Sequence, residues 1–282
     1  MNSSKLKWLL IIIFLAANVF FLHQYATYST DINNYTDREI ELASQILSEG
    51  DSPVSPDVIP KNKTTQKVLK LEFSDQFHDT VAKRMLSSDF ASYVLPEGIA
   101  YTNDNETLLF TDEHTFVYTA SQNTDARKII ERLILDSSDT PNSSGLLKKL
   151  SKKLGTPDNV SLSLISSYEK DGYVYIRVKE SINGFSIDSA TLGALFLNGN
   201  VIHIEGTVFL PNSVSKFTSD ALDIINLLFS IESQGSQITN IEELYYPVMT
   251  DNGAVYLTPS FRITYADQSV HLWDSTSCIQ RY

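Results

Sequence analysis

The N-terminal thirty residues of this 282-residue chain constrain its fold and location most strongly. Lys5 and Lys7 precede a long uncharged run whose first half is apolar except for Asn18. A bilayer core about 30 Å thick needs about 20 helical residues, so Trp8–Tyr28 is long enough to span it. Because the lysines come first and the flank after the run is acidic, the positive-inside rule predicts a single-pass protein of the cell membrane, with a cytoplasmic N-terminus and an extracellular remainder.

A cleaved secretory signal peptide is the alternative for this run. The segment after Leu22, His23–Tyr28, is bulky and polar and lacks the small-x-small pattern of a cleavage site, so we expect an uncleaved anchor. We also expect Asn18, with the small Ala16 and Ala17, to contact a partner transmembrane helix. A carboxamide in hydrocarbon gains about 0.6–2 kcal/mol from such a contact. The alternative is a hydrogen bond from Asn18 to its own backbone.

The composition after the run describes an acidic, folded domain. All 34 acids lie beyond residue 30, and the whole chain has a formal charge of −12, which argues against nucleic acid as a partner. Hydrophobic residues make up 42% and aromatic residues 11%, enough for a packed core. Cys278 is the only cysteine, so no intrachain disulfide can form and the domain must fold without one.

The predicted fold class is α+β, with one transmembrane helix followed by two antiparallel-sheet units, each packed with helices. Helical spacing of apolar residues predicts a juxtamembrane helix over 31–49, and Gly50 followed by three prolines predicts a linker. The predicted divisions are a cytoplasmic tip and anchor at 1–30, a juxtamembrane helix and linker at 31–66, a first α+β unit at 67–157, and a second, sheet-rich unit at 158–282.

Turn residues and periodicity predict the elements inside these units. Asp171-Gly172 and Asn198-Gly199 favour the positive φ angles of tight hairpins, so each should join two long strands. Three helices are predicted: an amphipathic one at Thr124–Leu135, a short basic one at Leu146–Leu154, and one from a cap at Thr218 or Ser219 to Phe229.

No catalytic or metal-binding spacing is present in the sequence. The chain lacks Gly-x-Ser-x-Gly, His-Glu-x-x-His and a P-loop. Asp112-Glu113-His114 offers metal-ligand types, but neighbouring side chains point in different directions, which favours a solvated turn. Cys278 has no paired base nearby in sequence and is expected to be an inert thiol. We therefore expect no catalytic residue, no metal and no cofactor.

Three segments resemble the YycI family of membrane proteins from Gram-positive bacteria. The first is the anchor with its exit sequence, Phe14–Tyr25. The second is a paired strand that ends in a glycine turn, residues 168–187, followed by the Asn-Gly turn within 195–201. The third is the closing order of elements: a helix over 219–229, then Ile238–Tyr246, Phe261–Tyr265 and Trp273. The resemblance covers the full length of the chain.

The resemblance implies a non-catalytic regulator. Proteins of this family act with a YycH-like protein on the sensor histidine kinase WalK (YycG) of a two-component system that controls cell-wall metabolism. Such regulation would run through ectodomain contacts and through transmembrane-helix contacts within the bilayer, and it needs only a difference in contact energy between two kinase states. Two alternatives of other classes remain: an anchored extracellular module that binds a ligand between the two units, and a cell-surface enzyme.

Overall fold

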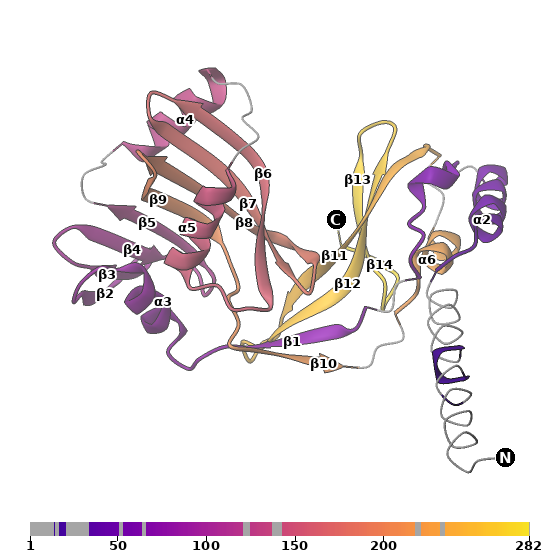
Figure 1. Ribbon diagram of the computed structural model, residues 1–282, viewed down its shortest axis with the longest axis horizontal. Helices are drawn as coiled ribbons and strands as arrows, with labels where there is room; N and C mark the ends of the chain where they lie inside the picture. The colour runs from indigo at the N-terminus through magenta and orange to yellow at the C-terminus, as the bar shows by residue number, and fades with distance from the viewer. Residues whose placement is uncertain are drawn as a thin grey trace, which may run out of the picture. The chain divides into compact units, whose positions relative to one another are not determined.

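The computed structural model describes residues 14, 17–20, 34–50, 53–63, 66–120, 125–136, 143–217, 221–231 and 235–281. The chain forms two compact units of mixed α and β structure (Figure 1). Unit 1 comprises Met1–Lys67, Ser219–Glu242 and Ser260–Tyr282, and unit 2 comprises Val68–Thr218 and Glu243–Pro259. The strands β11 (Ile238–Met249) and β12 (Val255–Tyr265) contribute residues to both units.

The predicted transmembrane span Trp8–Tyr28 lies mostly outside the described residues. Phe14 and Ala17–Phe20 fall inside it, and both are helical. In the part of the chain that the structure describes, no helix is both long enough and apolar enough to cross a membrane. The anchor therefore stays a prediction from the sequence.

Unit 2 is a mixed sheet with helices on both faces. Its elements are β1 (Val68–Glu72), α3 (Phe77–Met85), β2 (Ala91–Leu95), β3 (Gly98–Thr102), β4 (Glu106–Phe110), β5 (Thr115–Ala120), α4 (Ala126–Asp136), α5 (Ser144–Leu154), β6 (Val160–Lys170), β7 (Tyr173–Ile182), β8 (Phe185–Leu197), β9 (Asn200–Thr207) and β10 (Ser213–Phe217). Together with parts of β11 and β12, the strands run in the order β10-β1-β12-β11-β8-β9-β5-β4-β3-β2, and β7 and β6 extend from β8.

The two faces of this sheet follow from the alternation of side chains along β7. Ile176 and Val178 pack with α3 and α5 in the largest core cluster, whereas Tyr175 packs with α4. Successive strand residues point to opposite faces, so α4 covers one face while α3 and α5 cover the other. The sequence predicted a long strand after the Asp171-Gly172 turn, but it did not predict helices on both faces of the sheet.

Unit 2 differs from the prediction in two ways: in where the chain divides and in the direction of one strand pair. The predicted boundary at 157/158 falls inside the unit, because β5 pairs antiparallel with β9 and joins both predicted halves in one sheet. The sheet is also not purely antiparallel, since β11 pairs parallel with β8 at Leu244 and Tyr245. A parallel pair needs a long crossover, and residues 198–237 between these strands supply it.

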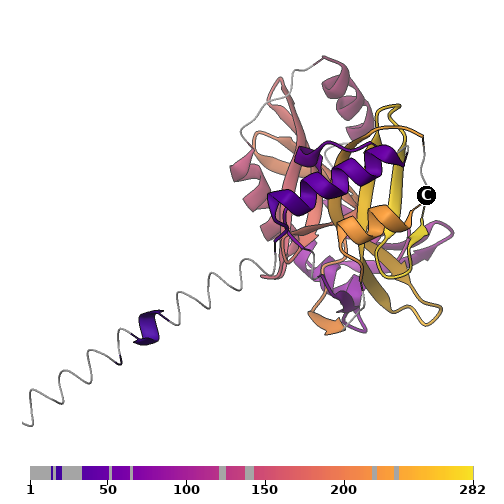
Figure 2. The same cartoon turned by 90° about the vertical axis from the view of Figure 1, so that its right-hand side faces the viewer.

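Unit 1 is a two-helix layer packed on strands (Figure 2). After the predicted anchor, its described residues form two α-helices, α2 (Asp37–Glu49) and α6 (Ile224–Ser230), and the 3₁₀ turn η1 (Pro56–Val58). Its strands are the remaining parts of β11 and β12 together with β13 (Val270–Asp274) and β14 (Ile279–Gln280). Thr36 caps α2 in a capping box with Glu39, whose carboxylate accepts from the Thr36 backbone N–H at 2.7 Å.

Two predictions for unit 1 need correction. The segment predicted as a linker packs into the unit, because Val54 and Ile59 are buried in the same core cluster as α2 and α6. The helix predicted from Thr218 or Ser219 begins instead at Ile224, where Asp223 accepts a hydrogen bond from the backbone N–H of Asn226 at 2.9 Å.

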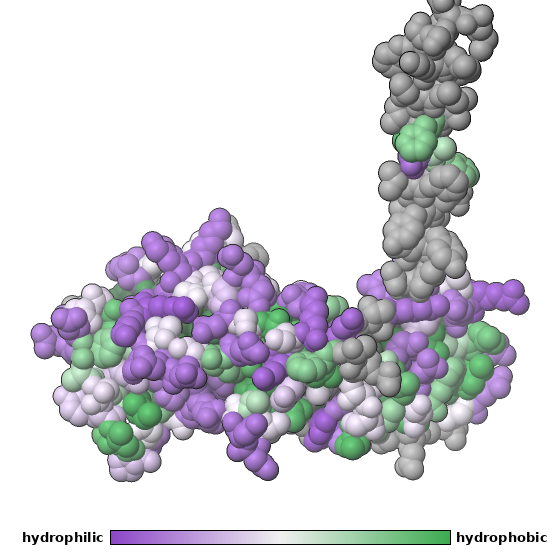
Figure 3. Space-filling view, turned by 90° about the horizontal axis from the view of Figure 1, so that it is seen from below, coloured by the Kyte–Doolittle hydropathy of each residue, from purple (hydrophilic) through white to green (hydrophobic). Residues whose placement is uncertain are grey.

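The face of the molecule that Figure 3 shows is mostly polar. Hydrophilic residues predominate on the face that Figure 3 shows, and hydrophobic residues form small, separate patches. A contiguous group of exposed apolar side chains on such a surface is therefore a candidate for an interaction site.

Candidate functional site

Such a group lies in unit 1, at a groove between α2 and α6. Leu42 and Ile46 lie one helical turn apart on α2 and are 56% and 47% exposed, and Phe229 of α6 is 47% exposed. All three line a cavity of about 340 Å³. The sequence placed these apolar positions on helices, but it did not predict that they would remain exposed together.

Polar residues form one end of this groove. The Lys63 ammonium lies 5.1 Å from the centre of the Tyr35 ring and 3.2 Å from a Glu39 carboxylate oxygen. Burial first, and the nearby Asp223 carboxylate second, raise the pKa of Tyr35 above its usual range, so its phenol stays neutral. An apolar centre beside charged residues is the usual composition of a protein interface with a polar rim.

Of the residues predicted to contact a transmembrane partner, the structure describes Ala17 and Asn18, and Ala16 lies outside the described residues. The Asn18 side-chain amide donates to the Phe14 carbonyl oxygen at 2.9 Å, four residues back in its own helix. This is the alternative that the sequence left open. A contact from Asn18 to a second helix stays a prediction.

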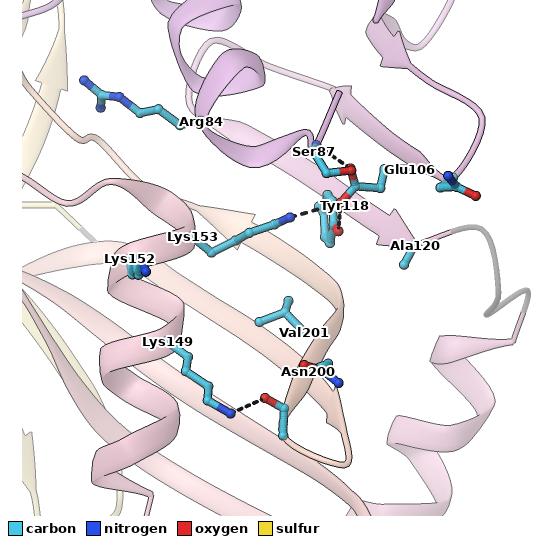
Figure 4. A pocket seen from close by; sticks show the side chains of 12 residues that line it. Arg84, Ser87, Glu106, Tyr118, Ala120, Lys149, Lys152, Lys153, Asn200 and Val201 are labelled. Atoms are coloured by element: carbon cyan, nitrogen blue, oxygen red, sulfur yellow. Dashed lines mark hydrogen bonds and ion pairs between the residues drawn. The ribbon is translucent and has the colours of Figure 1, made fainter. Parts of the chain in front are cut away.

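A second site lies in unit 2, around the buried carboxylate of Glu106 on β4 (Figure 4). Its oxygens accept from the Ser87 backbone N–H and hydroxyl, both at 2.6 Å, from the Tyr118 hydroxyl at 2.6 Å and from the Lys153 ammonium at 3.0 Å. Burial alone would raise the pKa of Glu106, but the hydrogen bonds from Ser87, Tyr118 and Lys153 lower it to about 2. Glu106 is therefore ionised at neutral pH.

The lysines of α5 meet this carboxylate at a cavity of about 590 Å³. In Figure 4, Lys153 points from α5 towards Glu106 and Tyr118, and Lys149 points towards the turn before Asn200. The sequence predicted a short basic helix at the position of α5, and this was the signal that could have pointed to the lysines of the cavity. Nothing local in the sequence linked it to Glu106, which is 47 residues away from Lys153.

The turn at Asp112-Glu113-His114 is not solvated throughout as predicted. His114 is only 4% exposed, and its ring centre lies 4.5 Å from that of Phe73 and 5.2 Å from that of Phe77. Burial is the main cause that lowers the pKa of His114 to about 4, so the imidazole is neutral at pH 7. His114 therefore belongs to an aromatic cluster of the core, because its ring supplies packing surface that a turn pattern does not reveal.

Metal ligands do not gather in the described ranges. There, no group of three His, Cys, Asp or Glu side chains is placed to hold a metal ion. His203 is instead engaged within the sheet, with Nδ1 at 3.1 Å from the Thr119 hydroxyl and Nε2 at 3.5 Å from a Glu205 carboxylate oxygen. Cys278 is half-buried and packs against the core of unit 1.

Comparisons with known proteins show a likeness of structure alone. No known protein family matches the sequence, and no curated protein does so. Solved structures that resemble the chain include the following two. One is an uncharacterised protein from Eubacterium rectale, with a TM-score of 0.45 and 10% identity over 82% of this chain and 89% of that protein. The other is the YpeB C-terminal domain from Bacillus megaterium, with a TM-score of 0.34 and 12% identity over 75% of this chain and 97% of that domain.

Proposed function

We propose that this chain is a non-catalytic, membrane-anchored regulator of a sensor histidine kinase that controls cell-wall metabolism, and that it acts with a YycH-like partner. The proposal draws on the apolar run Trp8–Tyr28, on the acidic domain after it and on the resemblance of three segments to the YycI family. In this proposal the N-terminal helix contacts the kinase within the bilayer of the cell membrane, and the extracellular domain holds the partner.

The observation that best supports an ectodomain contact is the α2–α6 groove. Leu42, Ile46 and Phe229 come from two helices that are far apart in the sequence, and each leaves about half of its side chain exposed around one cavity. Exposed apolar side chains cost solvation energy, and burial recovers about 25 cal/mol per Å². A folded partner domain with an apolar ridge would fit this groove, which lies on the first described helix after the predicted anchor.

Replacing Ile46 by aspartate should weaken the association of the full-length protein with its YycH-like partner by tenfold or more. A charge buried at an interface without a partner costs several kcal/mol, and 1.4 kcal/mol already corresponds to about tenfold. The matched control is Gln45→Asp, which places the same charge at the neighbouring exposed position outside the groove. Co-purification from membranes at equal protein level measures both. Equal retention of the partner by Ile46→Asp and Gln45→Asp would rule out the groove.

Replacing Asn18 by leucine tests the membrane contact separately. If Asn18 bonds a kinase helix, the substitution should lose about 0.6–2 kcal/mol, a fall in helix–helix affinity of roughly three- to thirtyfold. Kinase-controlled expression should then shift in the same direction as after deletion of the whole protein, though less far. If the bond to the Phe14 carbonyl is its only role, then kinase output and co-purification will both stay normal.

An anchored ligand-binding module remains the second candidate function, because of one specific observation. The cavity beside Glu106 lies within unit 2 and is lined by several cationic side chains. Removal of the N-terminal run distinguishes the two functions: a binding module should keep its ligand affinity as a soluble protein, whereas a regulator that acts through its membrane helix should lose its effect on the kinase.

A further inference from the structure

The cavity beside Glu106 concentrates positive charge in a chain that is strongly acidic. Arg84 from α3 and Lys149, Lys152 and Lys153 from α5 line it. Among the described residues around it, Glu106 is the single carboxylate, so the four cations and this one anion give the lining a net charge of +3. The whole chain carries a formal charge of −12, so this cluster runs against the bulk composition.

The buried carboxylate does not neutralise these other cations. Glu106 is held by Ser87, Tyr118 and Lys153, and the Lys153 ammonium also lies 4.5 Å from the centre of the Tyr118 ring. This network holds Lys153 in place and pairs its positive charge with the negative charge of Glu106. The remaining positive charge of the cavity therefore comes from side chains outside the network.

The partners of those side chains are uncharged. The Lys149 ammonium donates to the Gly199 carbonyl oxygen at 2.7 Å, and the Arg84 guanidinium donates to the Gly155 carbonyl oxygen at 3.3 Å. The Lys152 ammonium makes no hydrogen bond or ion pair to any residue that the structure describes. Because a carbonyl oxygen carries no net charge, all three cations keep their full charge for a ligand.

The arrangement on α5 suits a compact anion. Lys152 and Lys153 lie three and four positions after Lys149, so their Cβ atoms are about 5–6 Å from that of Lys149 on one helix face. A volume of about 590 Å³ is within the usual range of small-molecule sites. The side chains of Asn105 and Asn200 also line the cavity and offer hydrogen bonds to hydroxyl groups.

We propose that this cavity is a binding site for a phosphate monoester or diester that also carries hydroxyl groups, such as a phosphorylated polyol. Lysine ammonium groups bind phosphate as point charges, and a phosphate monoester carries about −1.5 to −2 charges at neutral pH. A phosphate ligand therefore offsets more of the excess positive charge of the lining than a ligand with one carboxylate would. The ligand can be a free molecule or the headgroup of a lipid, and this inference goes beyond the proposed regulatory function.

Calorimetric titration of the full-length protein in phosphatidylcholine nanodiscs with glycerol 3-phosphate tests the site. Saturable binding is expected, and uncharged glycerol at the same concentration should give none. The double substitution Lys149→Gln, Lys152→Gln should weaken binding by at least about tenfold, because each charge-assisted hydrogen bond is worth roughly that factor. Both lysines are exposed, so the variant should fold, and an unchanged unfolding temperature checks this.

Lys148→Gln is the matched control, since Lys148 is exposed on the same helix but does not line the cavity. It removes the same charge and should leave affinity within about twofold, as expected for a surface charge that contacts no ligand. The absence of saturable binding up to about 10 mM, which is weaker than the millimolar range of specific sites, would overturn the proposal. Equal weakening by Lys148→Gln would overturn it as well.

Replacing part of the phosphatidylcholine by phosphatidylglycerol distinguishes the two sources. If the lipid headgroup occupies the site, glycerol 3-phosphate should bind more weakly to the wild-type protein in these nanodiscs. If the ligand is a free molecule, its affinity should not depend on the lipid. Either result supports a phosphate site and identifies its source.

Discussion

Replacing Glu106 by alanine should lower the unfolding temperature of the full-length protein by roughly 6–12 °C. Loss of one partner of a buried ion pair costs about 3 kcal/mol or more, and 1 kcal/mol corresponds to about 2–4 °C at this size. The substitution leaves the Tyr118 hydroxyl and the Ser87 backbone N–H, which both donate to Glu106 at 2.6 Å, without their acceptor. It also leaves the Lys153 ammonium, 3.0 Å from Glu106, without its counter-charge.

Glu131→Ala is the control for this substitution. Glu131 lies on the surface of α4, 3.5 Å from Arg127, and exposed pairs of this kind contribute about 0.3–0.5 kcal/mol. Calorimetry should therefore show a shift of at most about 2 °C for Glu131→Ala. Equal shifts for the two variants would show that the Glu106 network does not stabilise unit 2.

The same network predicts a loss of stability in acid. The folded-state pKa of Glu106, about 2, lies below its ordinary value of 4.5, so the unfolded state takes up a proton first as pH falls. The stabilisation is complete above pH 4.5 and disappears as pH falls from 4.5 towards 2, by about 3 kcal/mol in total. Chemical denaturation across this range should show a steeper decline for the wild type than for Glu106→Ala, and parallel curves would contradict the assignment.

Features determined by local backbone geometry could be predicted from the sequence. The Asp171-Gly172 and Asn198-Gly199 turns have positive φ angles at all four residues, as tight hairpins require. The end of α2 before Gly50 was predicted as well. Both signals for it, the helical period of the apolar residues and the glycine that follows them, lie within one or two turns of the helix end.

Features determined by distant contacts could not be predicted from the sequence. Several Ser, Thr and Asp residues between 218 and 223 are equally good helix caps, and burial of Ile224 and Leu227 in the core of unit 1 selects Asp223. The proline-rich segment after Gly50 has the composition of a linker, yet Val54 and Ile59 pack against α2 and α6. The local sequence does not show against which part of the protein such apolar residues will pack.

The candidate sites show the same limit. The basic face of α5 is visible in the sequence, but the cavity forms only because β4, β5 and the turn after β8 come to its side. The groove in unit 1 likewise needs α2 and α6, which are separated by more than 170 residues. The sequence pattern of one helix shows its charged or apolar face. Which other helix or strand lies against that face to complete the site depends on the fold.

A second buried carboxylate, Glu180 on β7, should give the opposite pH dependence. Glu180 is fully buried, and burial is the main cause that raises its pKa to about 7, although the backbone N–H groups of Phe209 and Leu210 donate to it at 2.8 and 3.2 Å. Between pH 4.5 and 7 the unfolded chain has lost this proton while the folded chain retains it. Stability should therefore fall as pH rises through this range, by about 3 kcal/mol, and stay level above pH 7.

Glu180→Gln should remove this decline because glutamine does not titrate. The amide oxygen can accept from one of the two N–H groups, so below pH 4.5 the variant should be less stable than the wild type by about 1–3 kcal/mol. Above pH 7 the difference should have moved by about 3 kcal/mol in favour of the variant, since the wild type then bears a buried charge, so Glu180→Gln should be at least as stable as the wild type. Glu169→Gln, at an exposed position on β6, serves as the control and should follow the wild type throughout. If the difference between wild type and Glu180→Gln does not change between pH 4.5 and 7, then Glu180 is ionised across this range and the two N–H groups outweigh its burial.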